Sequence, residues 1–255
     1  MHTVLGMRPT SHDQVNGLIR DLLDRLQTVF GSDLVGAYLY GSAATGDFDP
    51  TRGDVDLVVA CASEVETRFR NLQTMHRELV LAHQEWNDRI DVIYLSTAAL
   101  RDLRSESVSL AVISPGEPLH LTEMSPKWSM NWYLVREQGV TLFGPPVRDL
   151  IPVVTQDEFV ASVRVHLQCW PAWIATSDRP GFHAYAVLTI CRALYTCRHG
   201  QQLSKVQAAQ WAAREFPEWA EVIEQALVWR ESPATAGRAP DAINFVNFAV
   251  QKTTE

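Results

Sequence analysis

The chain has 255 residues, 46% of them hydrophobic, which is enough for one large or two smaller globular domains with real cores. Its formal net charge of -8 argues against a broad basic face for binding nucleic acids. The N-terminus lacks the basic start and apolar run of a signal peptide, and no stretch is long and apolar enough to span a bilayer. A cytoplasmic protein without a membrane or nucleic-acid partner is therefore expected.

The N-terminal part alternates between helical and strand patterns. Apolar residues recur at helical spacing in the first segment, where Ser11 or Asp13 would be the cap, and β-prone runs follow between polar turns. Proline-rich sequence at 145–152 indicates a boundary. The predicted elements are a helix over 11–30, strands over 34–40 and 55–61, a helix over 64–84, a strand over 89–95, a short helix capped by Ser96, and a strand within 139–144.

The C-terminal part has a wholly helical pattern, with short polar breaks of the kind that join the helices of a bundle. The predicted fold class is α+β. A mixed sheet with helices forms an N-terminal domain over 1–150, and an all-α domain follows over 151–255. The predicted helical segments are 156–175, 183–199, 204–216, 217–230 and 240–252.

The turn after the first strand reads GSAATGDFDPTRGDVDLVVA, from Gly41 onward, and resembles a phosphate-binding loop only at its start. A Walker-type P-loop needs Lys and Ser/Thr directly after its last glycine, whereas Asp47 follows Gly46 here. A calcium-binding EF-hand loop is also excluded, because Arg52 and Val58 stand where that loop requires Gly and Glu. The turn therefore supplies carboxylates where a P-loop supplies a lysine.

Three aspartates on the predicted strands are candidate metal ligands. Asp54 and Asp56 are two residues apart at the start of a strand, so both side chains lie on one face. Asp91 stands between Ile90 and Val92 on the next predicted strand and would share the site if that strand lies alongside. The pair Asp54 and Asp56 suits Mg²⁺, which prefers one or two carboxylates together with phosphate oxygens of a substrate.

The glycine turn before these aspartates is a candidate phosphate-binding site. Backbone N–H groups around Gly41 and Ser42 are placed to bind phosphate oxygens, while the aspartates bind the cation that replaces the P-loop lysine. A zinc enzyme is not favoured, because the histidines include no H-x-x-x-H pair, and His76 and His83 are expected on a helix surface. Reduced core thiols are expected at Cys61, Cys169, Cys191 and Cys197.

Glycine and serine after a strand, then D-x-D at 54–56, then a lone carboxylate on the third strand resemble the nucleotidyltransferase superfamily. The segment VLTICRALYTCRHGQQLSKVQAAQWAAREFPE, starting at Val187, resembles the helical domain of the aminoglycoside adenylyltransferases that modify streptomycin and spectinomycin. The two halves together cover most of the chain.

The resemblance implies roles for individual residues. It implies transfer of AMP from ATP to a hydroxyl of a cationic aminoglycoside, with two Mg²⁺ ions on the carboxylates and Asp91 as catalytic base. A monomer is expected. It places Arg192 and Lys205 on the nucleotide phosphates, and Trp173 and Asp178 on the antibiotic. From its position in sequence alone, Trp173 would be interpreted as a core residue.

The sequence departs from the family pattern at three positions. The third carboxylate is Asp91 where the streptomycin and spectinomycin enzymes have Glu, and a family acid falls on Phe182 and another on Lys127. These departures concern the identity of the acceptor molecule and leave the residues for nucleotidyl transfer in place. Two alternatives stay open: a nucleotidyltransferase that modifies a protein or RNA in a stress response, and a non-catalytic nucleotide-binding regulator. The regulator would be expected to have lost a carboxylate, and all three are present.

Overall fold

The structure is a computed structural model, and it describes residues 8–103, 108–232 and 240–253. The chain forms two compact units, Met1–Val154 and Thr155–Glu255. The domain boundary expected after residue 150 lies at the end of α6 (Val147–Leu150), shortly before this division.

The first unit is built on a mixed six-stranded sheet in the order β5-β4-β3-β2-β1-β6. The pair β2 and β3 is parallel, and the other neighbours are antiparallel. This topology confirms the predicted mixed sheet. The strands are β1 (Leu34–Tyr40), β2 (Val55–Cys61), β3 (Ile90–Ser96), β4 (Ser109–Ser114), β5 (Glu117–Glu123) and β6 (Val140–Phe143).

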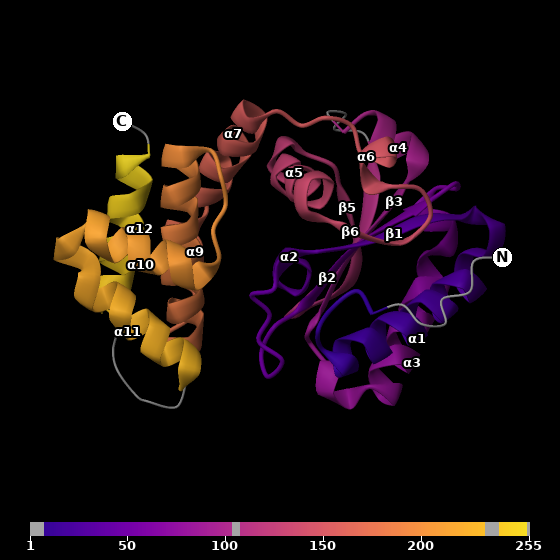
Figure 1. Cartoon of the computed structure of the whole chain (residues 1–255), viewed down its shortest axis with the longest axis horizontal. Helices are drawn as coiled ribbons and strands as arrows, with labels where there is room; N and C mark the ends of the chain where they lie inside the picture. The colour runs from indigo at the N-terminus through magenta and orange to yellow at the C-terminus, as the bar shows by residue number, and fades with distance from the viewer. Residues whose placement is uncertain (1–7, 104–107, 233–239, 254–255) are drawn as a thin grey trace. The chain divides into compact units, whose positions relative to one another are not determined.

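Helices cover both faces of this sheet (Figure 1). One face carries α1 (Asp13–Phe30) and α3 (Phe69–Ala82). The other carries α4 (Thr97–Arg101), α5 (Ser129–Gln138) and α6. The short helix α2 (Gly41–Thr45) follows β1, and single 3₁₀ turns complete the unit at Gly31–Asp33, Val65–Arg68, Gln84–Trp86 and Pro126–Trp128.

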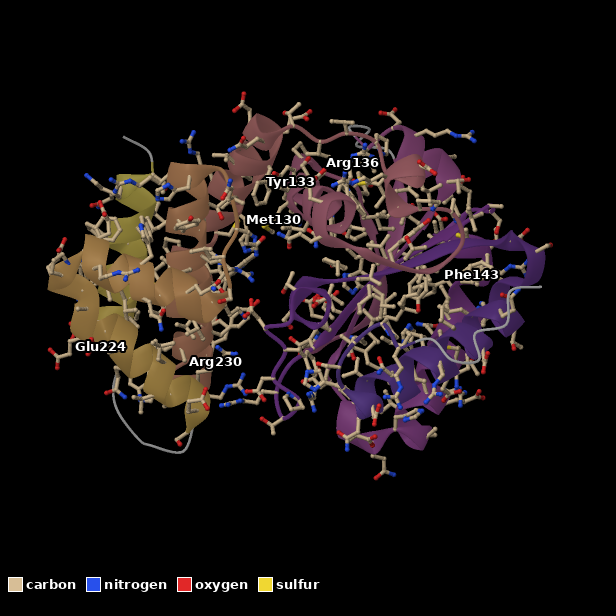
Figure 2. All side chains as sticks on the ribbon, in the orientation of Figure 1. Met130, Tyr133, Arg136, Phe143, Glu224 and Arg230 are labelled. Atoms are coloured by element: carbon tan, nitrogen blue, oxygen red, sulfur yellow. The ribbon has the colours of Figure 1, made fainter. Side chains whose placement is uncertain are left out.

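Alternation along the strands divides the buried side chains between the two faces. On β2, Leu57 and Val59 belong to the core under α1 and α3, whereas Val58 and Ala60 belong to the core under α4, α5 and α6. The period of two therefore assigns Asp56 to the same face as Val58. On that side, Arg136 of α5 donates to the carbonyl of Arg148 (2.7 Å) and to that of Ile151, which joins α5 to the end of α6 (Figure 2).

The second unit is helical, with α9 at its centre. Helix α9 packs against α7, α10, α11 and α12, and most of its side chains from His183 to Thr196 are buried. Thr155 and Ser204 begin α7 and α10 with capping boxes. The elements are α7 (Gln156–Leu167), α8 (Trp170–Ile174), α9 (Pro180–His199), α10 (Lys205–Glu215), a 3₁₀ turn (Pro217–Trp219), α11 (Ala220–Glu231) and α12 (Pro240–Lys252).

Several local expectations need correction. His12, not Ser11 or Asp13, is the N-cap of α1, and its side chain makes no capping hydrogen bond. The expected helix over 64–84 is a 3₁₀ turn followed by α3. Strands β4 and β5 and helix α5 occur where no element is predicted. By contrast, the Ser96 hydroxyl accepts a hydrogen bond from the Ala99 amide, which confirms the expected cap.

Two side chains lie elsewhere than expected. Cys169 is exposed, although Cys61 and Cys191 are buried as expected. His76 is only 3% exposed, because the helix that carries it packs against the sheet, and its Nε2 lies 2.7 Å from the hydroxyl of Tyr94. Burial lowers the pKa of His76 to about 4. Among the described residues, none of the helices is long and apolar enough to cross a membrane.

The buried His76 is expected to make the protein less stable in acid. The unfolded chain binds a proton at the ordinary histidine pKa near 6.5, whereas the folded state binds it near 4. Stability from neutral His76 is therefore complete above pH 6.5 and is lost as pH falls toward 4, by about 1–3 kcal/mol. Urea unfolding between pH 7 and pH 4 should show a smaller decline for His76→Gln. An unchanged pH dependence in that variant would contradict the assignment.

Candidate active site

The site is formed where β2 and β3 begin. Asp54 immediately precedes β2, and Asp56 is the second residue of that strand. Parallel pairing of β2 with β3 puts Asp56 directly opposite Asp91. Residues opposite each other on neighbouring strands point to the same face, so Asp56 and Asp91 share the face covered by α5. The register therefore places Asp91 beside Asp56, and Asp54 lies near enough for its charge to act on Asp91.

Asp91 has the properties of a carboxyl group that gains and loses a proton near neutral pH. Burial raises its pKa to about 7, a hydrogen bond from the Ser114 hydroxyl lowers it, and the charges of Asp54 and Glu117 raise it. The Ser114 Oγ lies 3.2 Å from Oδ1 of Asp91. The serine on β4 thus engages one carboxylate oxygen and fixes the orientation of the group.

Tyr40 closes the site on the side of β1. It is the last residue of β1 and lies opposite Asp56 in the antiparallel pair. Burial raises its pKa well above the ordinary value, and the charges of Asp91 and Asp56 raise it further. Its hydroxyl accepts a hydrogen bond from Nδ2 of Asn131 on α5 at 3.2 Å. Tyr40 therefore stays a neutral phenol beside the two carboxylates.

Gly41 brings the backbone of the glycine turn against Asp56. Its φ is +69°, and a Cβ at this position would lie 2.7 Å from Cγ of Asp56 and overlap Oδ2 of the same carboxylate. Glycine is needed here both for the left-handed backbone and for the close approach. Helix α2 begins at Gly41, so amides of Gly41 and Ser42 belong to its first turn, where N–H groups have no acceptor within the helix.

Replacing Gly41 with alanine should therefore impair the site more than the fold. Gly46→Ala is the matched control, because Gly46 also has a positive φ (+86°), but a Cβ added there would meet nothing within 4 Å. Both variants should lose about 1–3 kcal/mol of stability from backbone strain. Only Gly41→Ala displaces Asp56, so we expect its kcat to fall at least about 10-fold below that of Gly46→Ala. Equal activity in the two variants would show that the close approach is unimportant.

The residues present suit a magnesium ion completed by a substrate. The described part of the chain contains no group of three or more His, Cys, Asp or Glu side chains arranged to hold a metal ion by themselves. Mg²⁺ is commonly bound by one or two carboxylates plus substrate phosphates, and Asp54 and Asp56 on one face supply that number of hard oxygen ligands. The buried Asp91 beside them adds negative charge that a cation would neutralise.

The second unit contains the other predicted site residues. Trp173 of α8 is 43% exposed, and its ring lies 5.4 Å from that of Trp170, which in turn lies 5.7 Å from Tyr185 of α9. The Nζ of Lys205 lies 4.1 Å from the centre of the Tyr185 ring. These contacts join Trp173 and Lys205 through one aromatic cluster. The core position considered for Trp173 is thus wrong.

Asp178 and Arg192 lie near this aromatic cluster in sequence. Asp178 is exposed in the segment between α8 and α9. Arg192 is a half-buried residue of α9. With the side-chain amide of Gln202 turned so that its oxygen faces Arg192, that oxygen accepts hydrogen bonds from Nη1 (3.0 Å) and Nε (3.1 Å). Gln202 thereby orients the guanidinium.

Comparisons with known proteins match both halves of the chain. The family model of the nucleotidyltransferase domain matches residues 19–108, and that of the aminoglycoside adenylyltransferase C-terminal domain matches residues 149–252. The aminoglycoside (3'') (9) adenylyltransferase of Escherichia coli is 24% identical, with 98% of each chain covered. The chain belongs to the aminoglycoside adenylyltransferase family. As a member of this family the protein is a nucleotidyltransferase, as the sequence predicts.

Two further relatives support the family and the fold. A protein of the same name from Rhizobium radiobacter is 22% identical to this chain, with 92% of this chain and 91% of that one covered. The spectinomycin adenyltransferase AAD(9) from Enterococcus faecialis, solved with ATP and spectinomycin, has a TM-score of 0.74 at 13% identity. That match covers 94% of this chain and 99% of the other, and it shows the fold.

Three residues of the candidate site are not indicated by the sequence. Its pattern assigns Tyr40 only to a strand, although the residue before the glycine turn necessarily lies at the site. Ser114 and Asn131 come from β4 and α5, two elements that the sequence does not predict. No local signal indicates them, because their contacts depend on the order of strands in the sheet.

Proposed function

We propose that this enzyme transfers AMP from ATP to a hydroxyl of an aminoglycoside-type antibiotic similar to streptomycin or spectinomycin, with Mg²⁺, and releases pyrophosphate. The observation that carries the proposal is the register of Asp56 and Asp91 beside the glycine turn at Gly41. The names of the matched relatives, aminoglycoside (3'') (9) adenylyltransferases, support the class of acceptor.

Asp54 and Asp56 are the proposed Mg²⁺ ligands, and the Asp91 carboxylate adds negative charge beside them. When bound, the metal would supply positive charge that neutralises the phosphate oxygens and the leaving pyrophosphate. The backbone N–H groups of Gly41 and Ser42 would bind phosphate oxygens by hydrogen bonds. Catalysis of this kind depends on positioning and charge neutralisation, which matches a site built from carboxylates and amides.

Asp91 is the proposed general base. Its carboxylate accepts the proton of the acceptor hydroxyl while that oxygen forms a bond to the α-phosphorus of ATP. The bond from the α-phosphorus to the bridging oxygen breaks, and pyrophosphate leaves with the electron pair. Ser114 holds Oδ1 of Asp91, which leaves Oδ2 to receive the proton. Asp is one methylene shorter than the family's Glu, so the acceptor hydroxyl must lie correspondingly closer.

The helical unit supplies the remaining proposed contacts. Arg192 and Lys205 are proposed to bind the nucleotide phosphates, because both carry a positive charge and Arg192 is already oriented by Gln202. Trp173 and Asp178 are proposed to bind the acceptor. An exposed indole and an exposed carboxylate recognise a cationic sugar by stacking and by ion pairing.

The proposal is tested by incubating the protein with Mg²⁺, ATP and a panel of aminoglycosides and measuring the mass of each antibiotic. A mass gain of one adenylyl group on at least one antibiotic is expected, and none with Asp56→Asn. No gain across the panel would contradict the proposal. Transfer of labelled AMP to a protein or RNA in a cell extract would instead favour a macromolecular acceptor.

A further inference from the structure

Arg89 binds the segment that carries the metal-ligand motif by several hydrogen bonds. It stands immediately before β3 and two residues before Asp91. Its Nε and Nη2 donate to the Gly53 carbonyl at 3.1 and 2.8 Å, and Nη2 also donates to the Pro50 carbonyl at 3.0 Å. Its Nη1 donates to the Glu85 carbonyl at 3.3 Å. The guanidinium thus bridges three separate carbonyl groups.

The backbone of Arg89 reinforces this connection. The amide of Val55 donates to the carbonyl of Arg89 at 3.0 Å. Gly53 and Val55 are the two neighbours of Asp54 in the chain, so Arg89 binds the backbone on both sides of this aspartate. Through the same residue, Asp54 is connected to the strand that carries Asp91.

Packing fixes the Arg89 side chain itself. Its Cζ lies 4.5 Å from the centre of the Trp86 ring, which is 1% exposed. The Trp86 ring lies 6.3 Å from that of Phe48, which belongs to the same turn as Pro50 and Gly53. The Arg89 guanidinium is held on one side by an aromatic ring and on the other by backbone carbonyls. Its side chain therefore has little conformational freedom, and it holds the turn and the start of β3 rigidly together.

We propose that Arg89 is a positioning residue that sets the place of Asp54 relative to Asp91. The inference rests on the proposed function, in which these two carboxylates act together. Lysine cannot replace the arginine fully, because an ammonium is a point donor that cannot reach the Gly53, Pro50 and Glu85 carbonyls at once. Arg89 touches neither substrate nor metal in this proposal; it acts through Asp54.

The test compares Arg89→Met, Arg89→Lys and Arg25→Met. Arg25 is the matched control, because it also belongs to the first unit but pairs with carboxylates, Asp21 at 2.9 Å and Glu78 at 3.6 Å. Three kinds of measurement are made for each variant: Mn²⁺ affinity in the presence of ATP by electron paramagnetic resonance, kcat and KM for the acceptor, and amide hydrogen exchange at residues 51–55.

Arg89→Met is expected to weaken Mn²⁺ binding and lower kcat by about 10–100-fold, the usual effect of losing a residue that orients a metal ligand. KM for the acceptor should change little, and exchange at Gly53 and Asp54 should be faster. Arg89→Lys should recover part of the loss, and Arg25→Met should match the wild type in all three measurements.

Wild-type Mn²⁺ affinity and kcat in folded Arg89→Met would overturn the proposal. If Arg89→Met does not fold, Arg89→Lys decides the question. It keeps the charge and should still bind Mn²⁺ several-fold more weakly than the wild type, and wild-type Mn²⁺ affinity and kcat in this variant would overturn the proposal. A wild-type protein that binds Mn²⁺ and ATP but modifies no antibiotic would contradict the proposed function, while the Mn²⁺ and exchange measurements would still decide the role of Arg89.

Discussion

Asp54→Asn and Asp56→Asn are each expected to reduce turnover by about 1000-fold or more. A metal ion contributes several kcal/mol of charge stabilisation in the transition state, and each 1.4 kcal/mol corresponds to about a factor of ten in rate. An amide keeps the shape of the side chain but loses the negative charge that holds Mg²⁺ against the phosphates. Single-turnover adenylylation measured with saturating ATP gives the comparison directly.

The same substitutions should leave the fold intact. Asp54 and Asp91 repel each other, since the charge of Asp54 raises the pKa of Asp91. Without bound metal, removing one negative charge relieves this repulsion, and the unfolding temperature should stay equal or rise. Asp47→Asn is the matched control, because Asp47 is exposed in the same turn, and it should retain wild-type turnover. Full activity in either the Asp54 or the Asp56 variant would refute the metal assignment.

The sequence predicted the parts of the site that depend on local pattern. Strands β1 and β2 have the predicted bounds, because each is an apolar β-prone run ended by a glycine turn or by polar residues. The shared face of Asp54 and Asp56 follows from the period of two along a strand. Most helices of the second unit were predicted for a similar reason, since long periodic segments are the strongest signal a sequence contains. The segment predicted over 156–175 is instead two helices, α7 and α8, and that over 217–230 begins with a 3₁₀ turn.

The parts that depend on long-range pairing were not predictable. The pairing of Asp56 with Asp91 depends on β2 and β3 being parallel neighbours. The sequence predicts both strands but does not predict that they are neighbours. Strand β5 lies at the edge of the sheet, has Leu119 as its only buried residue and contains Pro118, all of which weaken its strand signal. Ser114 stands at the end of β4, and its contact with Asp91 depends on the pairing of β4 with β3, so it remained unassigned. Arg89 was also missed, because its partners are backbone carbonyls that no sequence pattern marks.

Asp91→Asn is expected to lower kcat by about 100–10,000-fold, the range for loss of a general base. Asp91→Glu is the matched control, because it keeps a carboxylate at the position and restores the residue type of the family, and it should lose less than about 10-fold. In the wild type, kcat/KM should decline as pH falls below about 7, where the Asp91 carboxyl gains a proton and can no longer accept one. Asp91→Asn should lack this decline in its residual activity.

Asp91→Asn should also stabilise the metal-free protein at alkaline pH. This measurement distinguishes a catalytic base from a residue that mainly supports the fold. Burial raises the folded-state pKa of Asp91 to about 7, above the ordinary value of 3.8, so the folded state holds the proton more tightly than the unfolded chain. Stability is thus lost as pH rises from about 4 to 7. With EDTA at pH 8, urea unfolding should show the asparagine variant more stable by about 1–3 kcal/mol. A variant that is both inactive and less stable at pH 8 would indicate that Asp91 mainly supports the fold.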